Sequence, residues 1–549
     1  MKKALLILLA LVMALSLFAC KDNTSSDGGQ TGNTPTGNTP TGNTQQNSPP
    51  PSVGVAPEPP PEGAQFAEHI EIMQDAMITA VIDAFNPAGD VASTHWIYTM
   101  FTDKLMVYNE ADGSFEPQLA TEWSTNDNQT FIFHLRDDVY FHNGDHFTAE
   151  DVKWTIEISR EFPASVVYDR WSAVAEANVI DPYTIELVLH APNTGFYSAL
   201  VWPVSGIYSS RAYREQPDNW TWIGTGPYIV TDFSTGAYTA LTRNDDWWGG
   251  VMPTKTITFR NVIEEAVRPL MMLDGDFDYS LGINPDDLDL FDDSPDFQLI
   301  RRRLNSPICI NFNMSDPLMS DLNFRMAVIH SLNGGEMGLV AEGERGYAEM
   351  TELEGGVWGF ATAYRKTDIP RPQQDLDLAR QYLAQSSYNG ETIVILNPGA
   401  ALSRGAAMLQ TYLEQIGVNC VVDTTDQPSM MAQLGIGNNQ SHIHVFPCPS
   451  DLNPFSMVRN NYTVSSANRT SYINPEIEEL FARASASTDP EVHRAVFYEI
   501  QDIVSGVYNS YPIFWKDFTD VAKSGVSGFI LSAQSQFHNF RGIYRLLDD

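Results

Sequence analysis

A strand–helix–strand pattern between residues 391 and 425 constrains the fold of this chain more than any other feature. "GETIVIL" and "VNCVVDTT" are rich in β-branched residues and read as strands. The helix predicted between them has one apolar stripe, formed by Leu402, Ala406, Leu409, Leu413 and Ile416. Gly417 is the expected C-cap. A right-handed helical crossover between two parallel strands satisfies this pattern, so the sequence predicts an α/β fold.

Other segments add strands and helices on both sides of this unit. Two alternating segments predict half-buried strands, with Phe131, Phe133 and Leu135 inward in "TFIFHLR" and Ile185, Leu187 and Leu189 inward in "YTIELVLH". Thr148 and Asp151 form a capping-box-like helix start, and Asn474 with Pro475 begins a later helix. The stretch "EVHRAVFYEIQDIVSGVY" is amphipathic at the helical period. A chain of 549 residues is too long for a single core, so two or more domains are expected.

The N-terminus has the pattern of a secretion signal. Lys2 and Lys3 precede an apolar run that is too short for a comfortable membrane span. "LFAC" resembles a bacterial lipobox ending at Cys20, which predicts a lipidated cysteine after a signal peptide of residues 1–19. An ordinary signal peptide that happens to contain this cysteine is the alternative. Residues 20–64, with "TGNTPTGNTPTGNT" and "SPPPSVGVAPEPPP", predict a disordered tether, because they lack apolar periodicity.

The remaining cysteines and the charge exclude several classes of protein. Cys309, Cys420 and Cys448 are an odd number without a CxxC pair, which argues against a disulfide framework and a structural zinc site. The formal charge is -37, with 69 acidic residues against 32 basic ones, which argues against nucleic acid as a partner.

Motifs for catalysis are missing from the sequence. It contains no G-x-S-x-G, H-E-x-x-H or G-x-x-x-x-G-K-[ST] pattern, and the acidic run "NPDDLDLFDDSPD" is typical of a solvated face. His142 and His146 flank Asn-Gly, a tight-turn signal, which favours a strand-to-helix corner over a metal site. His442 and His444 alternate in "SHIHV" and are a somewhat better ligand pair, but a third ligand is lacking nearby. We therefore expect a protein that is not an enzyme and has no cofactor or metal.

A long motif points to a known family. The segment from residue 115 to 157 reads "FEPQLATEWSTNDNQTFIFHLRDDVYFHNGDHFTAEDVKWTIE". Its characteristic positions are Pro117, Leu119, Ala120, Trp123, Phe133, Leu135, Arg136, Phe141, Gly144, Thr148, Ala149, Glu150, Asp151 and Val152. "DAFNPAG", "GTGPY", "RNDDWWGG", "YINPEIEELFARA" and "YPIFW" follow in the family's order. From about residue 70 onward, the chain resembles the extracytoplasmic solute-binding proteins of peptide and nickel ABC importers.

The resemblance implies an α/β, two-lobed periplasmic-binding-protein type II fold, which closes like a flytrap and carries an extra domain on its first lobe. The first lobe is expected to comprise residues 65–105, 223–310 and 505–549, with the extra domain at 106–222 and the second lobe at 311–504. We expect the chain to cross between the lobes near residues 304–313 and 500–512.

The resemblance also suggests where a ligand binds. Peptide-binding members hold the ligand's α-ammonium with an Asp from a Trp-x-x-Asp pattern, and "FPCPSDLNP" places Asp451 one residue from that position. Asp451 is the only acid between Asp426 and Glu476. The alternative is that it only shapes the loop, as Asp often does. The candidate ligand-binding residues are Asp451, Ser450, Asn453, Phe446, Cys448, Arg404, Trp358, Trp515 and Asn86.

The expected function is therefore capture of oligopeptides at the outer face of the cell membrane by a lipid-anchored monomer. The expected partners are an ABC importer permease, the peptide, and the membrane through the lipid anchor. Another solute, such as an oligosaccharide, nickel chelate, haem or glutathione, is an alternative ligand. A surface hydrolase or a ligand sensor is an alternative class of protein.

Overall fold

The computed structural model describes residues 61, 63–74, 83–85, 92–109, 114–163, 165–360, 364–425, 429–430, 433–434, 441–448, 454–464, 468–487, 489–532 and 538–547. The chain divides into two units, residues 1–48 and 49–549, and every described residue belongs to the second unit. The fold reported below is that of the second unit alone.

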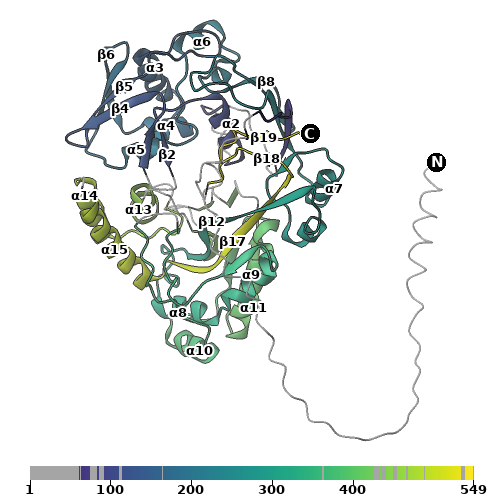
Figure 1. Cartoon of the computed structure of the whole chain (residues 1–549). Helices are drawn as coiled ribbons and strands as arrows, with labels where there is room; N and C mark the ends of the chain where they lie inside the picture. Colours follow the sequence, from purple (N-terminus) through teal and green to yellow (C-terminus); the bar gives the residue numbers. More distant parts are fainter. Residues whose placement is uncertain are drawn as a thin grey trace, which may run out of the picture. The chain divides into compact units, whose positions relative to one another are not determined.

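A large mixed sheet runs through the described part of this unit (Figure 1). Its strands follow the order β15-β14-β16-β12-β17-β11-β1-β10-β9-β8, and β13 pairs with β17 beside this path. The strands before the centre of the chain are β1 (His69–Gln74), β8 (Tyr228–Ser234), β9 (Tyr238–Arg243), β10 (Thr256–Asn261) and β11 (Tyr279–Ser280). Those from the centre onward are β12 (Phe297–Phe312), β13 (Tyr347–Glu349), β14 (Ile393–Asn397), β15 (Cys420–Thr424), β16 (Ile443–Pro447) and β17 (Ser510–Lys523).

Two long antiparallel strands, β12 and β17, join the two halves of this sheet. The segment from Phe297 to Arg303 pairs with the end of β17, whose other edge pairs with β11. The segment from Pro307 to Phe312 pairs with the start of β17 and, on its other edge, with β16. The register shifts between Arg303 and Pro307, within the region predicted as the first crossing. Both strands therefore pass from one half of the sheet to the other.

Ion pairs fix the first segment of β12 to β17. Asp517 is buried and binds Arg303 at 2.7 Å and Arg301 at 2.6 Å. Asp520, also buried, binds Arg302 at 3.1 Å and accepts a hydrogen bond from the Tyr279 hydroxyl at 2.8 Å. These contacts satisfy charges that would be costly to bury alone.

The strand–helix–strand unit predicted from the sequence is confirmed. β14 and β15 are parallel, and α11 (Ala400–Gln415) connects them. The predicted stripe of α11 is buried, and Gly417 has a φ of 89°, the left-handed conformation that glycine adopts without strain. α8 (Leu322–Ser331), α9 (Gly334–Glu342) and α10 (Leu376–Gln385) belong to the same half, whose core includes Phe324, Met337 and Ala379.

Three helices form a separate layer of this half: α13 (Pro454–Tyr462), α14 (Pro475–Ser485) and α15 (Pro490–Val507). Asn474 caps α14 through a hydrogen bond from the Glu476 amide, with Pro475 at the first turn, as predicted. Their inward residues share a core with Cys309 and Trp358. The layer follows directly after residues 449–453 along the chain, the segment that the sequence nominates for ligand binding.

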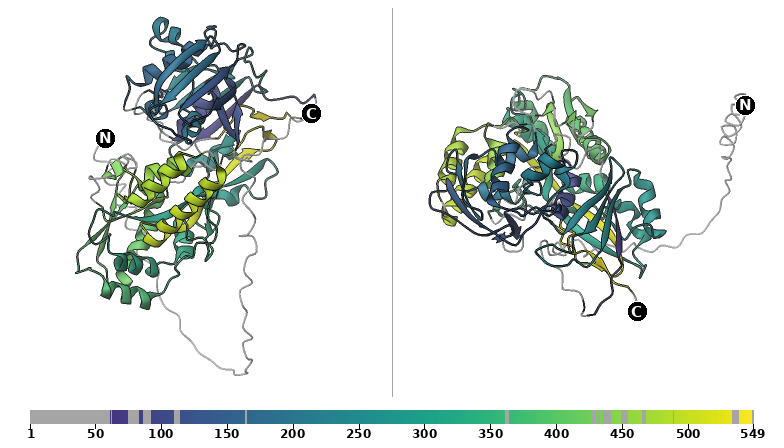
Figure 2. Two further views of the ribbon diagram at one scale, coloured as in Figure 1. Left: turned by 90° about the vertical axis from the view of Figure 1, so that its left-hand side faces the viewer. Right: turned by 90° about the horizontal axis from the view of Figure 1, so that it is seen from above.

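Residues 106–222 include a second, four-stranded antiparallel sheet, shown in blue in the left view of Figure 2. Its order is β4-β5-β7-β6, with β4 (Ala120–Thr125), β5 (Thr130–Leu135), β6 (Val174–Asp181) and β7 (Thr184–Leu189). The predicted inward residues of β5 and β7 are buried. α3 (Ala149–Ser159) begins at Thr148, whose amide donates to the Asp151 carboxylate at 3.0 Å, so this helix start is confirmed.

Short elements complete the part of the fold that precedes β12. They are α2 (Ala92–Phe101), β2 (Met106–Asn109), β3 (Ser114–Pro117), α4 (Val166–Trp171), α5 (Phe196–Leu200), α6 (Ser210–Glu215), η2 (Trp220–Trp222), η3 (Glu265–Val267), α7 (Arg268–Leu273) and η4 (Pro285–Leu290). β18 (Val526–Ser527) and β19 (Tyr544–Arg545) form a small hairpin-like pair after β17. One hydrophobic core extends from β1 through the four-stranded sheet, whereas the half built on β14–β16 has its own cores.

Candidate functional site

A cavity of about 270 Å³ lies between the extra domain and the helical layer of the second half. One wall comes from α4, α5 and the segment between β7 and α5. The opposite wall comes from α13 and α14. Because α13 begins at Pro454, this wall comes three residues after Asp451 in the sequence. A concave space between two separately built bodies is where a solute is expected to bind.

Aromatic rings from both walls form part of the apolar lining of the cavity. Phe196 and Trp202 belong to the extra domain, and Phe455 and Phe481 belong to α13 and α14. Phe455 is held edge-on against Phe497 of α15, with ring centroids 5.0 Å apart. A side-chain carbon at Gly195 would lie 2.9 Å from the Cβ of Phe455, so a glycine is required where the two walls approach each other.

Among the described lining residues, the ionisable ones are Arg170, His190 and Arg459. The guanidinium of Arg170 lies over the ring of Trp202, with 4.3 Å between Cζ and the ring centroid. Arg459 lies in the last turn of α13 and is exposed, as is His190 just after β7. Sequence reasoning missed all three, because they are distant along the chain and match no motif. No local signal in the sequence could have assembled them.

The segment after β16 contains a disulfide. Cys309 of β12 and Cys448 are bonded, with their Cα atoms 5.6 Å apart. The expectation that the odd cysteine count argues against a disulfide framework was therefore wrong for this pair. The two residues are 139 positions apart, and only the pairing of β12 with β16 brings them together. Cys448 is buried and bonded rather than presenting a free thiol to a ligand.

A small, buried polar region lies beside the disulfide. Phe446 and Cys448 line it together with His444 and Arg469. The guanidinium of Arg469 lies 5.0 Å from the ring centroid of Phe446, and burial lowers its pKa. Burial, with the nearby charge of Arg469, lowers the pKa of His444 to about 3, so this histidine is neutral. The volume of this region is about 10 Å³, enough for a water molecule and not for a solute.

The other predicted ligand residues lie in different places. Trp358 is buried against Phe497 in the core of the helical layer. Trp515 is buried on β17, where its indole N–H donates to Glu354 at 3.3 Å. Arg404 projects from α11 toward Asp286 of η4, at 3.9 Å.

Phe446 and Cys448 line the small polar region, and Trp358 lines a second small space in the protein. Val357 borders both spaces, so these three residues lie in one part of the molecule. Asp451, Ser450, Asn453, Asn86 and Cys20 lie outside the described residues. The ligand-binding roles assigned to all these residues stay predictions.

The two histidines of "HNGDH" serve separate structural purposes. His142 accepts a hydrogen bond from the Gly224 amide at Nδ1, and its Nε2 donates to the Gly226 carbonyl at 2.9 Å. Burial lowers its pKa, in keeping with this neutral tautomer. His146 instead contacts the Asp137 carbonyl at 2.9 Å through Nε2. Gly144 between them has a φ of 84°, as the predicted turn requires.

One histidine of the second pair, His442, also has a structural partner. The Nδ1 atom of His442 accepts a hydrogen bond from the Val394 amide at 3.0 Å. Within the described residues, no group of three or more His, Cys, Asp or Glu side chains is arranged to hold a metal ion.

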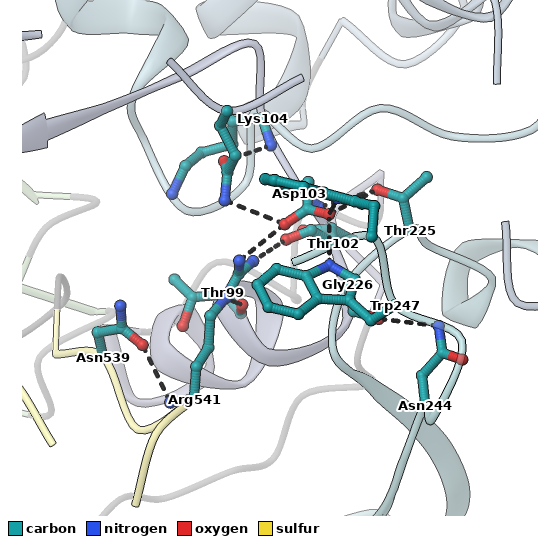
Figure 3. A network of polar contacts seen from close by, with 12 residues as sticks. Thr99, Thr102, Asp103, Lys104, Thr225, Gly226, Asn244, Trp247, Asn539 and Arg541 are labelled. Atoms are coloured by element: carbon teal, nitrogen blue, oxygen red, sulfur yellow. Dashed lines mark hydrogen bonds and ion pairs between the residues drawn. The ribbon is translucent and has the colours of Figure 1, made fainter. Parts of the chain in front are cut away.

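A buried carboxylate, Asp103, organises the first half (Figure 3). Its Oδ1 atom binds Arg541 at 2.7 Å, and its Oδ2 atom accepts hydrogen bonds from the indoles of Trp247 and Trp248 at 3.2 and 2.9 Å. Thr225 of "GTGPY" donates to the same oxygen. The network ties α2, two of the family motifs and the C-terminal segment together, which gives those motifs a structural role.

Neighbouring groups extend this network. Arg541 also donates to the carbonyl of Thr102 at 2.7 Å, beside the end of α2. A side-chain carbon at Gly224 or Gly226 would overlap the backbone of Phe101, so both glycines are required for this close approach. Lys104 is buried next to Asp103, and desolvation, with the charge of Arg541, lowers its pKa to about 7.

Fold and site together define a two-lobed binding protein, and comparisons with known proteins agree. Residues 114–472 match the family "Bacterial extracellular solute-binding proteins, family 5 Middle". The chain belongs to this family.

Individual relatives have low sequence identity to this chain. A Brucella ovis protein, named as a peptide-binding protein of an ABC transporter, is 24% identical over 366 residues, which cover 63% of this chain and 67% of that protein. The glutathione-binding protein GsiB of Shigella boydii is 22% identical over 438 residues, covering 76% and 84% of the two chains. The structure of DppA from Helicobacter pylori, in complex with the peptide STSA, superposes with a TM-score of 0.74 at 19% identity, covering 88% of this chain and 99% of that one. This superposition confirms the periplasmic-binding-protein type II fold expected from the sequence.

Among the described residues, no helix has both the length and the apolar character needed to cross a bilayer.

Proposed function

We propose that this protein is the solute receptor of an ABC importer, which captures oligopeptides outside the cell and delivers them by closure of its two lobes. The observation that carries the proposal is the position of the 270 Å³ cavity. It lies between the extra domain and α13–α14, which belong to halves of the molecule joined through β12 and β17. A solute held there contacts both halves and stabilises their closed arrangement, which is the state that a transporter reads.

The proposal divides the chain as the sequence suggested. The first lobe carries the extra domain, and the second lobe comprises residues 311–504. The bend is confined to the two crossings, and the register shift between Arg303 and Pro307 supports the position of the first. Residues 1–19 are a signal peptide, and a lipid on Cys20 holds the monomer at the outer face of the membrane.

Peptides are the first candidates for the ligand, because the Brucella relative is named for peptides and the Helicobacter structure contains one. Asp451 binds the α-ammonium of the peptide in this proposal. Glutathione is the second candidate, because the Shigella relative is named for it. Glutathione is itself a small peptide, so both candidates suit one cavity with polar and aromatic walls.

The test is native mass spectrometry of the purified protein, followed by small-angle scattering with any peptide that binds. We expect a retained or added peptide mass and a smaller radius of gyration in its presence. Failure to bind any peptide, or an unchanged radius with a bound one, contradicts capture by lobe closure. Cys20→Ala should release the protein from membranes, and continued membrane association after a high-salt wash contradicts the anchor.

A further inference from the structure

The cavity between the extra domain and α13–α14 is kept open by the small size of the residues on one wall. Much of the wall on the extra domain is supplied by Ala173, Ala191, Gly195 and Ala199. Their short side chains leave room that larger ones would fill, whereas protein interiors rarely contain voids larger than a water molecule. The space of about 270 Å³ can therefore take a group from outside the protein.

The opposite wall presents two aromatic rings in a fixed arrangement. The ring centroids of Phe455 and Phe481 lie 6.1 Å apart. Phe455 is buried and packs edge-on against His493 and Phe497, with 5.0 Å between the centroids in each pair. Phe481 is only partly buried, so some of its surface is accessible where it lines the cavity. This wall offers the edge-on or offset contacts that aromatic rings prefer.

The volume of the cavity limits what part of a solute it can hold. An apolar cavity of about 150 Å³ is enough for benzene, whereas pockets that enclose a whole drug-sized ligand have about 300–1,000 Å³. A space of about 270 Å³ lies between these two sizes. The walls also meet at Gly195, where a side-chain carbon would lie 2.9 Å from the Cβ of Phe455. The cavity therefore suits one large side chain and not a whole oligopeptide.

We infer that the cavity takes one large apolar side chain of a bound peptide, an aromatic one above all, and that the two facing walls set this preference. The inference rests on the proposed function and adds a side-chain preference to it. A ring between Phe455, Phe481 and the small residues of the extra domain buries its surface against both walls. Arg459 and His190, at exposed positions of the lining, keep their contact with water when this side chain binds.

The experiment compares three pools of synthetic tetrapeptides that have free termini, no charged side chains and one variable position. The first pool has Phe or Trp at that position, the second has Leu or Met, and the third has Ala. The other positions are mixtures of Gly, Ala and Ser. Pairs of pools compete for the full-length protein, and native mass spectrometry identifies the bound peptides by their masses.

We expect the first pool to bind about tenfold to a hundredfold more tightly than the third, as burial of one large apolar side chain supplies, with the second pool between them. Phe481→Ala removes a partly buried ring, and Ala191→Leu fills the cavity from an exposed position on the other wall. Each should reduce this ratio at least about threefold. Tyr213→Ala and Ala482→Leu are the matched controls, because both residues are exposed and lie outside the lining, and these variants should keep the ratio.

A photoreactive phenylalanine at the variable position tests where the side chain binds. After irradiation, its cross-links should map to residues 190–202, to α13 or to α14, and an excess of the first pool should prevent them. Cross-links confined to other segments overturn the inference.

Equal binding of the first and third pools, or a ratio that neither Phe481→Ala nor Ala191→Leu reduces, also overturns the inference and leaves peptide capture standing. Binding of none of the pools overturns peptide capture and the inference with it.

Discussion

Two sets of ion pairs in this molecule are built in opposite ways. The Asp103–Arg541 pair is buried, with 0% and 12% of the side chains exposed, and it is surrounded by indole, hydroxyl and amide donors. The pairs that join η4 to the second half are exposed. Arg345 binds Asp292 at 2.8 Å and Asp289 at 3.3 Å, and 87% of the Asp289 side chain is accessible.

Under the proposed lobe closure, the difference predicts which parts move against each other. Breaking a buried pair leaves an uncompensated charge in the interior, whereas exposed pairs exchange with water at little cost. The Asp103 network connects α2 to the motifs at residues 224–228 and 243–250, so these parts behave as one body. The Arg345 contacts join η4, whose Leu288 belongs to a first-half core, to a loop beside Tyr347 of a second-half core. Such contacts suit an interface that opens.

The largest effect is expected from the buried pair. Asp103→Asn keeps the shape and removes the charge, so that Arg541 is left buried without its partner. We expect a loss of about 3–5 kcal/mol in the free energy of unfolding, measured by chemical denaturation. Asp289→Asn, at the exposed pair, is the control and should lose less than about 1 kcal/mol. Similar losses of unfolding free energy in the two variants would contradict the distinction between the buried and the exposed ion pairs.

The disulfide is a second permanent join, between β12 and the residue that follows β16. Replacing Cys309 and Cys448 together by Ser should lower stability by about 2–4 kcal/mol, because the bond closes a long loop in the unfolded chain. Thermal unfolding of the variant, and of the wild type with and without reductant, measures this loss. The variant should lose the sensitivity to reductant that the wild type has. If reductant lowers the thermal stability of the wild type and the variant equally, the sensitivity to reductant does not come from this disulfide.

Lys104 allows a test of the buried network by pH. Its pKa falls from 10.5 in the unfolded chain to about 7 in the folded one, so the unfolded state binds more protons between these values. Stability relative to Lys104→Met should therefore rise with pH above about 7, by about 2 kcal/mol between pH 6.5 and 8.5. Chemical denaturation of the wild type and of Lys104→Met at the two pH values gives the difference in unfolding free energy between them. The contributions of other titrating groups are the same in both proteins and cancel in this difference. A difference that is constant with pH would show that Lys104 is not desolvated.

The smallest effect on stability, and the sharpest on motion, is expected at Arg345. Arg345→Gln should change the unfolding free energy by less than about 1 kcal/mol but shift the population of closed molecules. Single-molecule energy transfer between labels on the two halves measures that population at low and high salt. Arg380→Gln, which removes an exposed pair with Asp377 inside α10, should leave it unchanged. An unaltered population in the Arg345 variant would mean that this contact is not part of the moving interface.

Local elements were predictable because their signals are local. The stripe of α11, the start of α3 and the alternation in β5 each depend on spacings of a few residues, and the structure confirms all three. The acidic run at 284–296 was interpreted as a solvated face, and it is largely exposed, but its pairing with Arg345 needs a residue that lies some 50 positions away.

The site was harder to predict from the sequence, because its contacts join residues that are far apart along the chain. Cys448 was assigned to the ligand because it lies beside Asp451, while its bond depends on a strand 139 residues earlier. Arg170 and Arg459 belong to segments with no shared pattern, and only the packing of the extra domain near α13 brings them to one cavity. Asp451 stays a prediction.

The position of β17 in the sheet also has a consequence for how the chain is made. This strand begins at Ser510 of 549 residues, yet it lies between β11 and β12, which were synthesised about 200 residues earlier or more. A nascent chain therefore lacks the central strand of its largest sheet until translation is almost complete. Pairings of such long sequence separation form slowly. The large sheet should therefore stay incomplete until late in synthesis, which suits the passage through a secretion channel that the proposed signal peptide implies, and loss of the last forty residues should prevent this sheet from forming.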